Sequence, residues 1–249
     1  MEGNSFLRNS QIVVLGLCIA TATIIASLIF SQGAMRVIRF NREVISVTGS
    51  ADQKINSDYM VWKLNFSKRS PRLTEAFVLL KADLKTVKDY LTAKGLKDSE
   101  LITAPISTEI LYKKNEKGNN TNEIERYLLS QEVEVRSYDV ERVTQISREA
   151  TELIDKGVEL VSNAPEYFYT KLAELKIVML REATQDAKKR AEEIASSSGN
   201  KIGAIRSARM GVFQITPVNS YEVSDWGTND TSSLEKRVTA VVKAEFAIT

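Results

Sequence analysis

The chain has 249 residues, of which 43% are hydrophobic and 27% are charged, so we expect it to fold rather than to be disordered. It contains no histidine and one cysteine, which excludes a Ser-His-Asp triad, a histidine-ligated metal, an intrachain disulfide and a cysteine-based zinc or iron–sulfur site. Its 34 Lys+Arg and 32 Asp+Glu give a formal net charge of +2, which lacks the basic excess of a protein that binds nucleic acid through phosphates.

An apolar run from Ile12 to Phe30 is the first element of the chain. Its 19 residues carry no charge, and at about 1.5 Å per residue a helix of that length nearly spans the hydrocarbon core of a bilayer. The apolar run of a secretory signal is usually shorter, about 7–15 residues. The sequence therefore predicts a transmembrane anchor between a short N-terminal tail (1–11) and a linker (31–42), with a cleaved signal as the alternative.

Charge leaves the orientation of this anchor open. Arg36, Arg39 and Arg42 follow the apolar run, and the positive-inside rule read literally would place the large domain in the cytoplasm. Long domains, however, translocate largely regardless of charge.

Residues 43–249 are predicted to form one α+β domain. Apolar residues alternate with polar ones in several segments, which indicates strands, and recur every three or four residues in three others, which indicates helices. The expected strands cover 44–49, 60–67, 102–112, 127–136, 158–161, 167–169, 202–215 and 238–248. The expected helices start at Pro71 (with Ser70 as N-cap), Val140 and Lys171, and end near Gly95, Gly157 and Gly199. Three helices packed on an antiparallel or mixed sheet, preceded by a single transmembrane helix, are the expected architecture.

No sequence motif in the chain points to a reaction. There is no Walker A sequence and no GxGxxG after a strand, and Asp225–Asp230 lacks the spacing of an EF-hand. We therefore predict no catalytic residue, no cofactor and no metal ion. An Asp/Glu or Ser–Lys hydrolase stays open, because carboxylate pairs cannot be located without a fold.

Four short stretches, taken in order, resemble the SIMPL domain family, a domain of unknown function. They are Ile45–Ser50, Ser57–Trp62, the alanine- and charge-rich Ala183–Ala195, and the closing strand Val238–Ile248. The resemblance covers nearly all of residues 43–249. The chain has Asn56-Ser57-Asp58 where many members have Pro-Asp.

The resemblance implies a bacterial, extracytoplasmic and often membrane-anchored α+β protein. It places the large domain in the periplasm, on a single-pass anchor in the inner membrane. It also implies a link to oxidative or envelope stress, but no established activity and no catalytic residues to carry over.

These observations favour a non-enzymatic envelope scaffold that assembles with itself and binds envelope protein partners but not nucleic acid. A single-span anchor and open sheet edges favour a homo-oligomer. Its interaction surface is expected in the polar loop 221–233 at Tyr221 and Trp226, because aromatic residues are enriched at binding hot spots. The alternative for Trp226 is that it packs on its own domain. The alternatives for the whole chain are an envelope hydrolase with convergent carboxylates and a subunit of a ring or tube with a continuous lumen.

Overall fold

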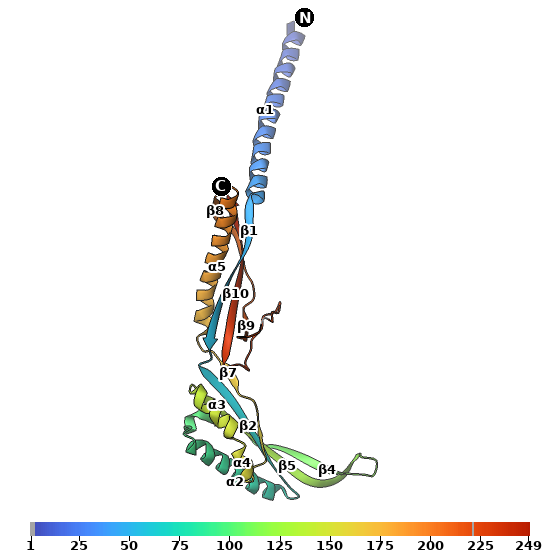
Figure 1. Cartoon of the computed structure of the whole chain (residues 1–249). Coiled ribbons are helices and arrows are strands. Elements are labelled where there is room, and N and C mark those ends of the chain that lie inside the picture. The colour runs from blue at the N-terminus through green and yellow to red at the C-terminus, as the bar shows by residue number, and fades with distance from the viewer. Residues whose placement is uncertain (1–2, 221) are drawn as a thin grey trace. The chain divides into compact units, whose positions relative to one another are not determined.

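A computed structural model describes residues 3–220 and 222–249, and the side chains of residues 13–35, 43–220 and 222–249 (Figure 1). The elements in chain order are α1 (Gly3–Arg42), β1 (Val44–Asn56), β2 (Tyr59–Ser70), α2 (Leu73–Ala93), the 3-10 helix η1 (Asp98–Glu100), β3 (Leu101–Thr103), β4 (Ser107–Lys114), β5 (Asn120–Ser137), α3 (Val140–Glu149), α4 (Glu152–Asp155), β6 (Leu160–Ser162), β7 (Glu166–Phe168), α5 (Leu172–Ser197), β8 (Ile202–Met210), β9 (Gln214–Pro217) and β10 (Glu235–Ile248). The strands form two sheets, and the predicted α+β class with a preceding apolar helix is confirmed.

The chain divides into two compact units. The smaller unit comprises residues 1–50, 181–211 and 241–249, and the larger unit comprises residues 51–180 and 212–240. Each unit is described by itself below.

The larger unit is built on a six-stranded sheet in the order β3-β5-β2-β6, with β4 added to β5 and β7 added to β2. Its longest ladder pairs β2 with β5 antiparallel, from Met60 opposite Ser137 to Ser70 opposite Tyr127. Side chains on one face of β2 are buried against α2, α3 and α4, as the predicted period of two requires. This core has Met60, Trp62, Leu64 and Phe66 at its centre, each at most 1% exposed.

Helix α2 starts later than predicted. Ser70 is still extended, because it is paired with Tyr127 in the sheet, and the N-cap position falls on Arg72. The Ser70 hydroxyl nevertheless contributes to the first turn, since it accepts from the Arg72 N–H and donates to Glu75 at 2.7 Å. The predicted N-cap is therefore wrong by two residues. The predicted end is correct: Gly95 has a φ of 92°, a left-handed conformation that ends a helix.

Three predicted elements are each divided in two. The expected strand 102–112 is β3 and β4, interrupted at Pro105, which has no N–H to give to a ladder. The expected strand 202–215 is β8 and β9, separated by residues 211–213. The helix expected from Val140 is α3 followed by the single turn α4.

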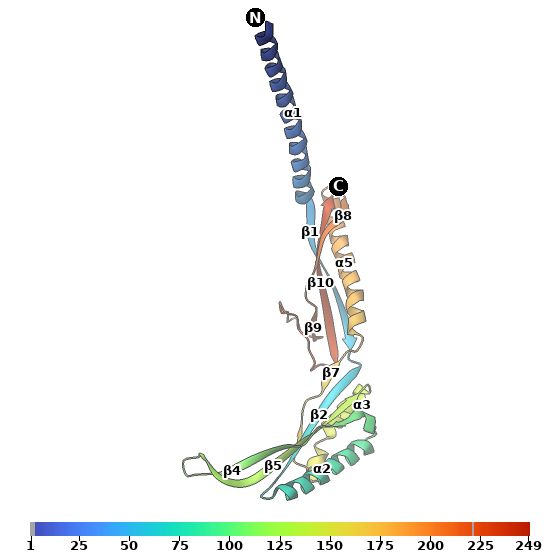
Figure 2. The ribbon, with the colours of Figure 1, turned by 180° about the vertical axis from the view of Figure 1, so that it is seen from behind.

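The smaller unit holds part of a second sheet, in which β10 lies between β1 and β8. β10 and β8 are antiparallel, with Val242 opposite Met210 and Ile248 opposite Ile202. Helix α5 lies along β1 and β10 in both views (Figures 1 and 2). The helix presents a stripe of alanines to the sheet, each fully buried: Ala183, Ala187, Ala191 and Ala195.

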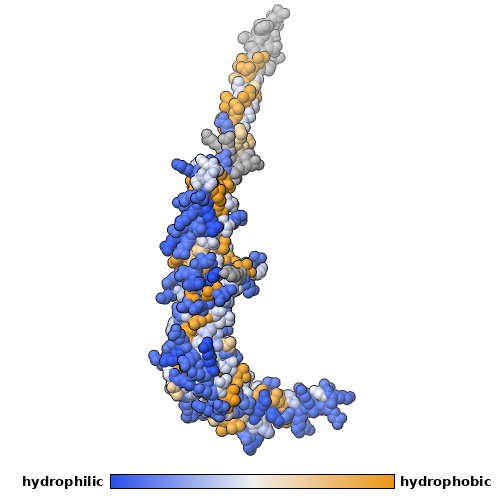
Figure 3. All heavy atoms as spheres, viewed as in Figure 1, coloured by the Kyte–Doolittle hydropathy of each residue, from blue (hydrophilic) through white to orange (hydrophobic). Residues whose placement is uncertain are grey.

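Helix α1 contains the predicted anchor. Its segment Val13–Met35 is 23 residues long, is not buried against the rest of the chain, and is long and apolar enough to cross a membrane or to serve as a signal sequence. Figure 3 shows this segment as mainly hydrophobic. The helix continues without a break through residues 31–42.

Candidate interaction surface

Gly49 lies on β1, in the first of the stretches that resemble the SIMPL family, and it allows the backbones of β1 and α5 to come into contact. A methyl group built on Gly49 would lie 2.2 Å from the Ala183 carbonyl oxygen and 2.3 Å from the Ala187 nitrogen. Real Cβ atoms do not approach backbone atoms so closely. Gly49 and the small alanines of α5 therefore have a packing role, and this explains why the two stretches occur together.

Two carboxylates complete this scaffold. Asp186 on α5 accepts a hydrogen bond from the Ser50 N–H at 2.9 Å and another from Arg190 at 2.8 Å. The Ser50 N–H, with help from Arg190, holds the pKa of the Asp186 carboxyl below its ordinary value. Asp58 accepts from both the N–H and the hydroxyl of Thr170, just before α5, at 2.7 Å each. The residues that carry the resemblance thus act as structural supports.

The Trp226 loop, defined here as residues 222–231, is different, because it places a large apolar side chain in solvent. Trp226 is 94% exposed and Val223 is 76% exposed. Val212 adds to this surface: it is 43% exposed, and its side chain lies 3.6 Å from a Cβ built on Gly227. The Trp226 ring therefore does not pack onto its own domain.

The buried side chain of Gln214 on β9 holds this loop from inside. Its amide group donates to the Ser224 carbonyl at 2.6 Å and accepts from the Thr228 N–H at 2.8 Å and from the Ser224 N–H at 3.4 Å. Gln214 is 8% exposed, so these bonds are shielded from water. One side chain thus fixes both ends of the turn that contains Trp226.

Backbone contacts fix the same turn. Ile215 and Asn229 form a parallel bridge, in which the Ile215 N–H donates to Thr228 and the Asp230 N–H donates to Ile215. Gly227 has a φ of 86°, and a Cβ there would lie 2.9 Å from the Phe213 carbonyl. The turn therefore requires glycine, both for its left-handed backbone and for this close approach.

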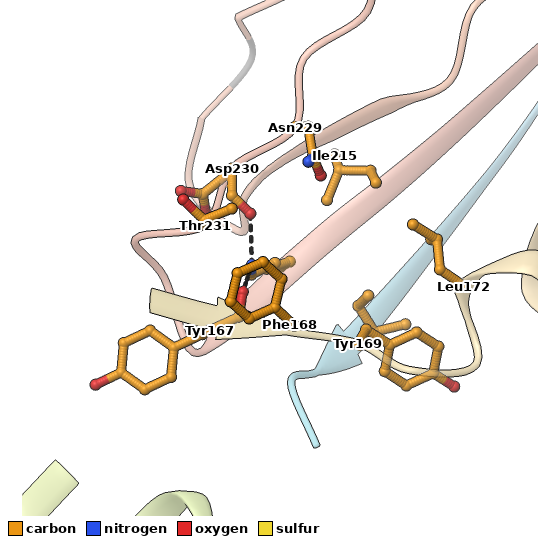
Figure 4. A pocket seen from close by; sticks show the side chains of 10 residues that line it. Tyr167, Phe168, Tyr169, Leu172, Ile215, Asn229, Asp230 and Thr231 are labelled. Atoms are coloured by element: carbon orange, nitrogen blue, oxygen red, sulfur yellow. Dashed lines mark hydrogen bonds between the residues drawn. The ribbon is translucent and has the colours of Figure 1, made fainter. Parts of the chain in front are cut away.

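A buried lysine ties the base of the loop to two strands. Lys236 on β10 is 3% exposed, and its ammonium donates to the Tyr167 carbonyl at 2.6 Å and to the Asp230 carbonyl (Figure 4). Burial lowers the pKa of Lys236, and the nearby Asp230 carboxylate partly offsets that effect. The two carbonyls give this charge the hydrogen bonds that a buried ion requires.

Lys236 also lines a cavity of about 100 Å³. Figure 4 shows side chains from the segment 167–172 and from the Trp226 loop around it, and in this view the Tyr167 ring points away from Ile215 and Leu172. The one carboxyl among the lining residues belongs to Asp230. Burial raises the pKa of Asp230, but hydrogen bonds from Ser232 and Ser233 and the charge of Lys236 together outweigh burial and leave that pKa below its ordinary value. The cavity thus combines one ammonium with one ionised carboxylate.

The predicted site residues fall in different places. Trp226 lies on the exposed surface just described, whereas Tyr221 lies outside the described residues. Phe30 is 80% exposed on α1, and the side chain of Ile12 is outside the described part of the chain. Within residues 3–220 and 222–249, no group of three His, Cys, Asp or Glu side chains is placed to hold a metal ion.

Sequence reasoning missed Gln214 and Lys236, the two buried side chains that hold the loop. Lys236 did leave a signal. It has the same parity along β10 as the buried Val238, Ala240 and Val242, so the alternation already places it on the buried face.

Comparison with known proteins identifies the family of the chain. No curated protein matches the chain. The model of the SIMPL family, described as a protein of unknown function (DUF541), matches residues 45–246. This match covers both sheets and every helix after α1, and the chain belongs to the SIMPL family.

Proposed function

We propose that the chain is a single-pass protein of the inner membrane whose SIMPL domain lies in the periplasm. There it acts as a non-enzymatic scaffold that self-assembles and binds envelope proteins. The observation that carries this proposal is the 94% exposure of Trp226 on a loop fixed by hydrogen bonds. A rigid loop loses little conformational entropy on binding, and an exposed tryptophan gains a large buried area.

The cavity beside Lys236 lacks the pair of carboxyl groups that an Asp/Glu hydrolase would need. Glycoside hydrolysis by carboxyl groups uses a pair of them, one as acid and one as nucleophile or base. The cavity contains one carboxyl group, Asp230, whose lowered pKa suits an ion-pair partner rather than a proton donor at neutral pH. Lys236, for its part, is engaged with two backbone carbonyls.

Disulfide cross-linking in native membranes tests self-assembly through the Trp226 loop. Cys18 is the one natural cysteine, so Cys18→Ser gives a background without thiols. In that background Val223→Cys, which leaves Trp226 in place, is expected to form dimers on mild oxidation. Asn119→Cys, exposed at the turn between β4 and β5, is the matched control and is expected to stay monomeric. Cross-linking of Asn119→Cys without cross-linking of Val223→Cys would contradict the proposal.

The same Asn119→Cys variant tests the orientation. A membrane-impermeant maleimide added to cells with a permeabilised outer membrane is expected to label it, because the domain is proposed to be periplasmic. Labelling that appears only after the inner membrane is broken would place the domain in the cytoplasm.

A further inference from the structure

The six-stranded sheet of the larger unit has a second face, opposite the one that packs against the helices. The side chains on this second face do not belong to the hydrophobic core. Along β2, Met60, Trp62 and Leu64 point into the core, so Tyr59, Val61 and Lys63 point to the other face. Tyr59, Val61 and Lys63 are all partly exposed. This second face is open to solvent over β2, β5 and β7.

Three aromatic rings from different segments gather at one end of this open face. Tyr59 on β2 is directly opposite Phe168 on β7, with ring centroids 6.5 Å apart and planes tilted by 55°. Tyr138, just after β5, lies 4.9 Å from Tyr59 with a tilt of 58°. Tyr138 is nevertheless 74% exposed, so burying it within this chain is not what holds the cluster together. We call Tyr59, Tyr138 and Phe168 the aromatic cluster.

A shallow groove of about 380 Å³ runs from this cluster across the sheet. Cross-strand pairing sets its lining, because Val61 is opposite both Arg136 and Glu166, and Lys63 is opposite Glu134. The groove therefore has aromatic rings at one end and hydrogen-bonding charged groups along its length.

The charges along the groove cancel. Lys63 lies 3.8 Å from Glu134, and Arg136 also contacts Glu134. With Glu166 the lining carries two positive and two negative side chains. A polyanion such as nucleic acid or a polycation gains no net attraction from such a surface, whereas a neutral ligand rich in hydroxyl groups finds both donors and acceptors.

We propose that this groove binds a neutral oligosaccharide. The C–H face of a pyranose ring packs on an aromatic ring, and its hydroxyls hydrogen-bond to carboxylates, guanidinium groups and ammonium groups. Tyr59 and Phe168 line the groove, Tyr138 extends their aromatic surface beside it, and Glu134, Arg136 and Glu166 supply the polar contacts. This site lies on β2, β5 and β7 and does not depend on the role proposed for the Trp226 loop.

The test uses the full chain in a detergent without a sugar head group. The probes are chitohexaose and maltohexaose at millimolar concentration, titrated by calorimetry. We expect at least one to bind, and Tyr138→Ala to weaken that binding about tenfold, the upper range for one aromatic contact. Tyr138→Phe, which keeps the ring, is expected to retain the affinity. Tyr112→Ala is the matched control, because it removes another exposed aromatic ring, on β4, and it is expected to leave the affinity unchanged.

Three results would overturn the proposal. One is that neither sugar binds the wild-type chain. Another is that Tyr138→Ala, with an unchanged melting temperature, binds the sugars as well as the wild type does. The third is that Tyr138→Ala lowers the mass of the protein in solution, because that would show a second copy of the chain covering this face. A failure of Trp226→Ala to affect assembly bears on the proposed function alone.

Discussion

The two units of the chain achieve close packing in opposite ways. The larger unit fills its interior with large side chains, among them Trp62, Phe66 and Met60, on one face of β2. The smaller unit leaves no room for a side chain at one point of contact between β1 and α5, because Gly49 lies against the helix backbone and the helix presents alanines. The burial of large apolar side chains dominates in the first unit, whereas the second adds a close van der Waals contact between backbones to its apolar burial.

This difference predicts opposite responses to a change in side-chain size. The larger unit is most sensitive to the removal of atoms, which leaves a cavity. The smaller unit is most sensitive to the addition of atoms, which the contact between β1 and α5 has no room for.

Trp62→Ala is expected to have the largest effect. Trp62 is fully buried and its indole N–H donates to Ser162 at 3.0 Å, so truncation leaves a large cavity and removes this hydrogen bond. We expect the free energy of unfolding to fall by about 3–5 kcal/mol. Chemical denaturation measures this, with Trp226→Ala as the control that should change stability by less than about 0.5 kcal/mol. Equal losses in the two variants would contradict the assignment of Trp62 to the core.

Gly49→Ala, which adds a single methyl group, is expected to come next. Its Cβ would displace the backbone of Ala183 and Ala187, and overpacking of this kind costs about 1–3 kcal/mol. Gly211→Ala is the matched control in the same unit, since its nearest neighbour would be the Val241 carbonyl at 3.4 Å. The comparison between the units breaks down if both substitutions lower the melting temperature equally.

Lys236→Met is expected to have a more local effect. It keeps the buried aliphatic chain but leaves the carbonyls of Tyr167 and Asp230 without their donor, at a cost of about 1–3 kcal/mol. Hydrogen exchange is expected to speed up in the Trp226 loop and at β7, while the core amides of β2 stay protected. Unchanged exchange in the loop would show that Lys236 does not hold it.

Asp186→Asn is expected to have the smallest effect, visible mainly as a change in pH dependence. The folded-state pKa of Asp186 lies below its unfolded value of about 3.9. Its stabilisation is therefore present above that value and is lost as the pH falls through the folded-state pKa. The difference in melting temperature between wild type and Asp186→Asn should be larger near pH 7 than near pH 3. Equal differences at the two pH values would contradict this role of Asp186.

The sequence predicted local features well and long-range contacts poorly. Alternation along β2 identified its buried face, and the apolar period identified α2 and α5. Gly49 gave no sign that it meets Ala183 and Ala187, because that contact joins segments far apart in the chain. The sequence does not reveal whether Trp226 is exposed, because its exposure depends on the hydrogen bonds that Gln214 makes across the loop.

The most direct test of the functional claim is the mass of the full chain in detergent micelles, measured by light scattering at several concentrations. We compare wild type with Trp226→Ala, and use Tyr138→Ala as a second exposed-aromatic control. Our account predicts a discrete wild-type oligomer that Trp226→Ala converts to a smaller species and Tyr138→Ala leaves intact, with unchanged melting temperatures. A wild-type monomer, or an oligomer that Trp226→Ala leaves unchanged, would contradict self-assembly through the Trp226 loop.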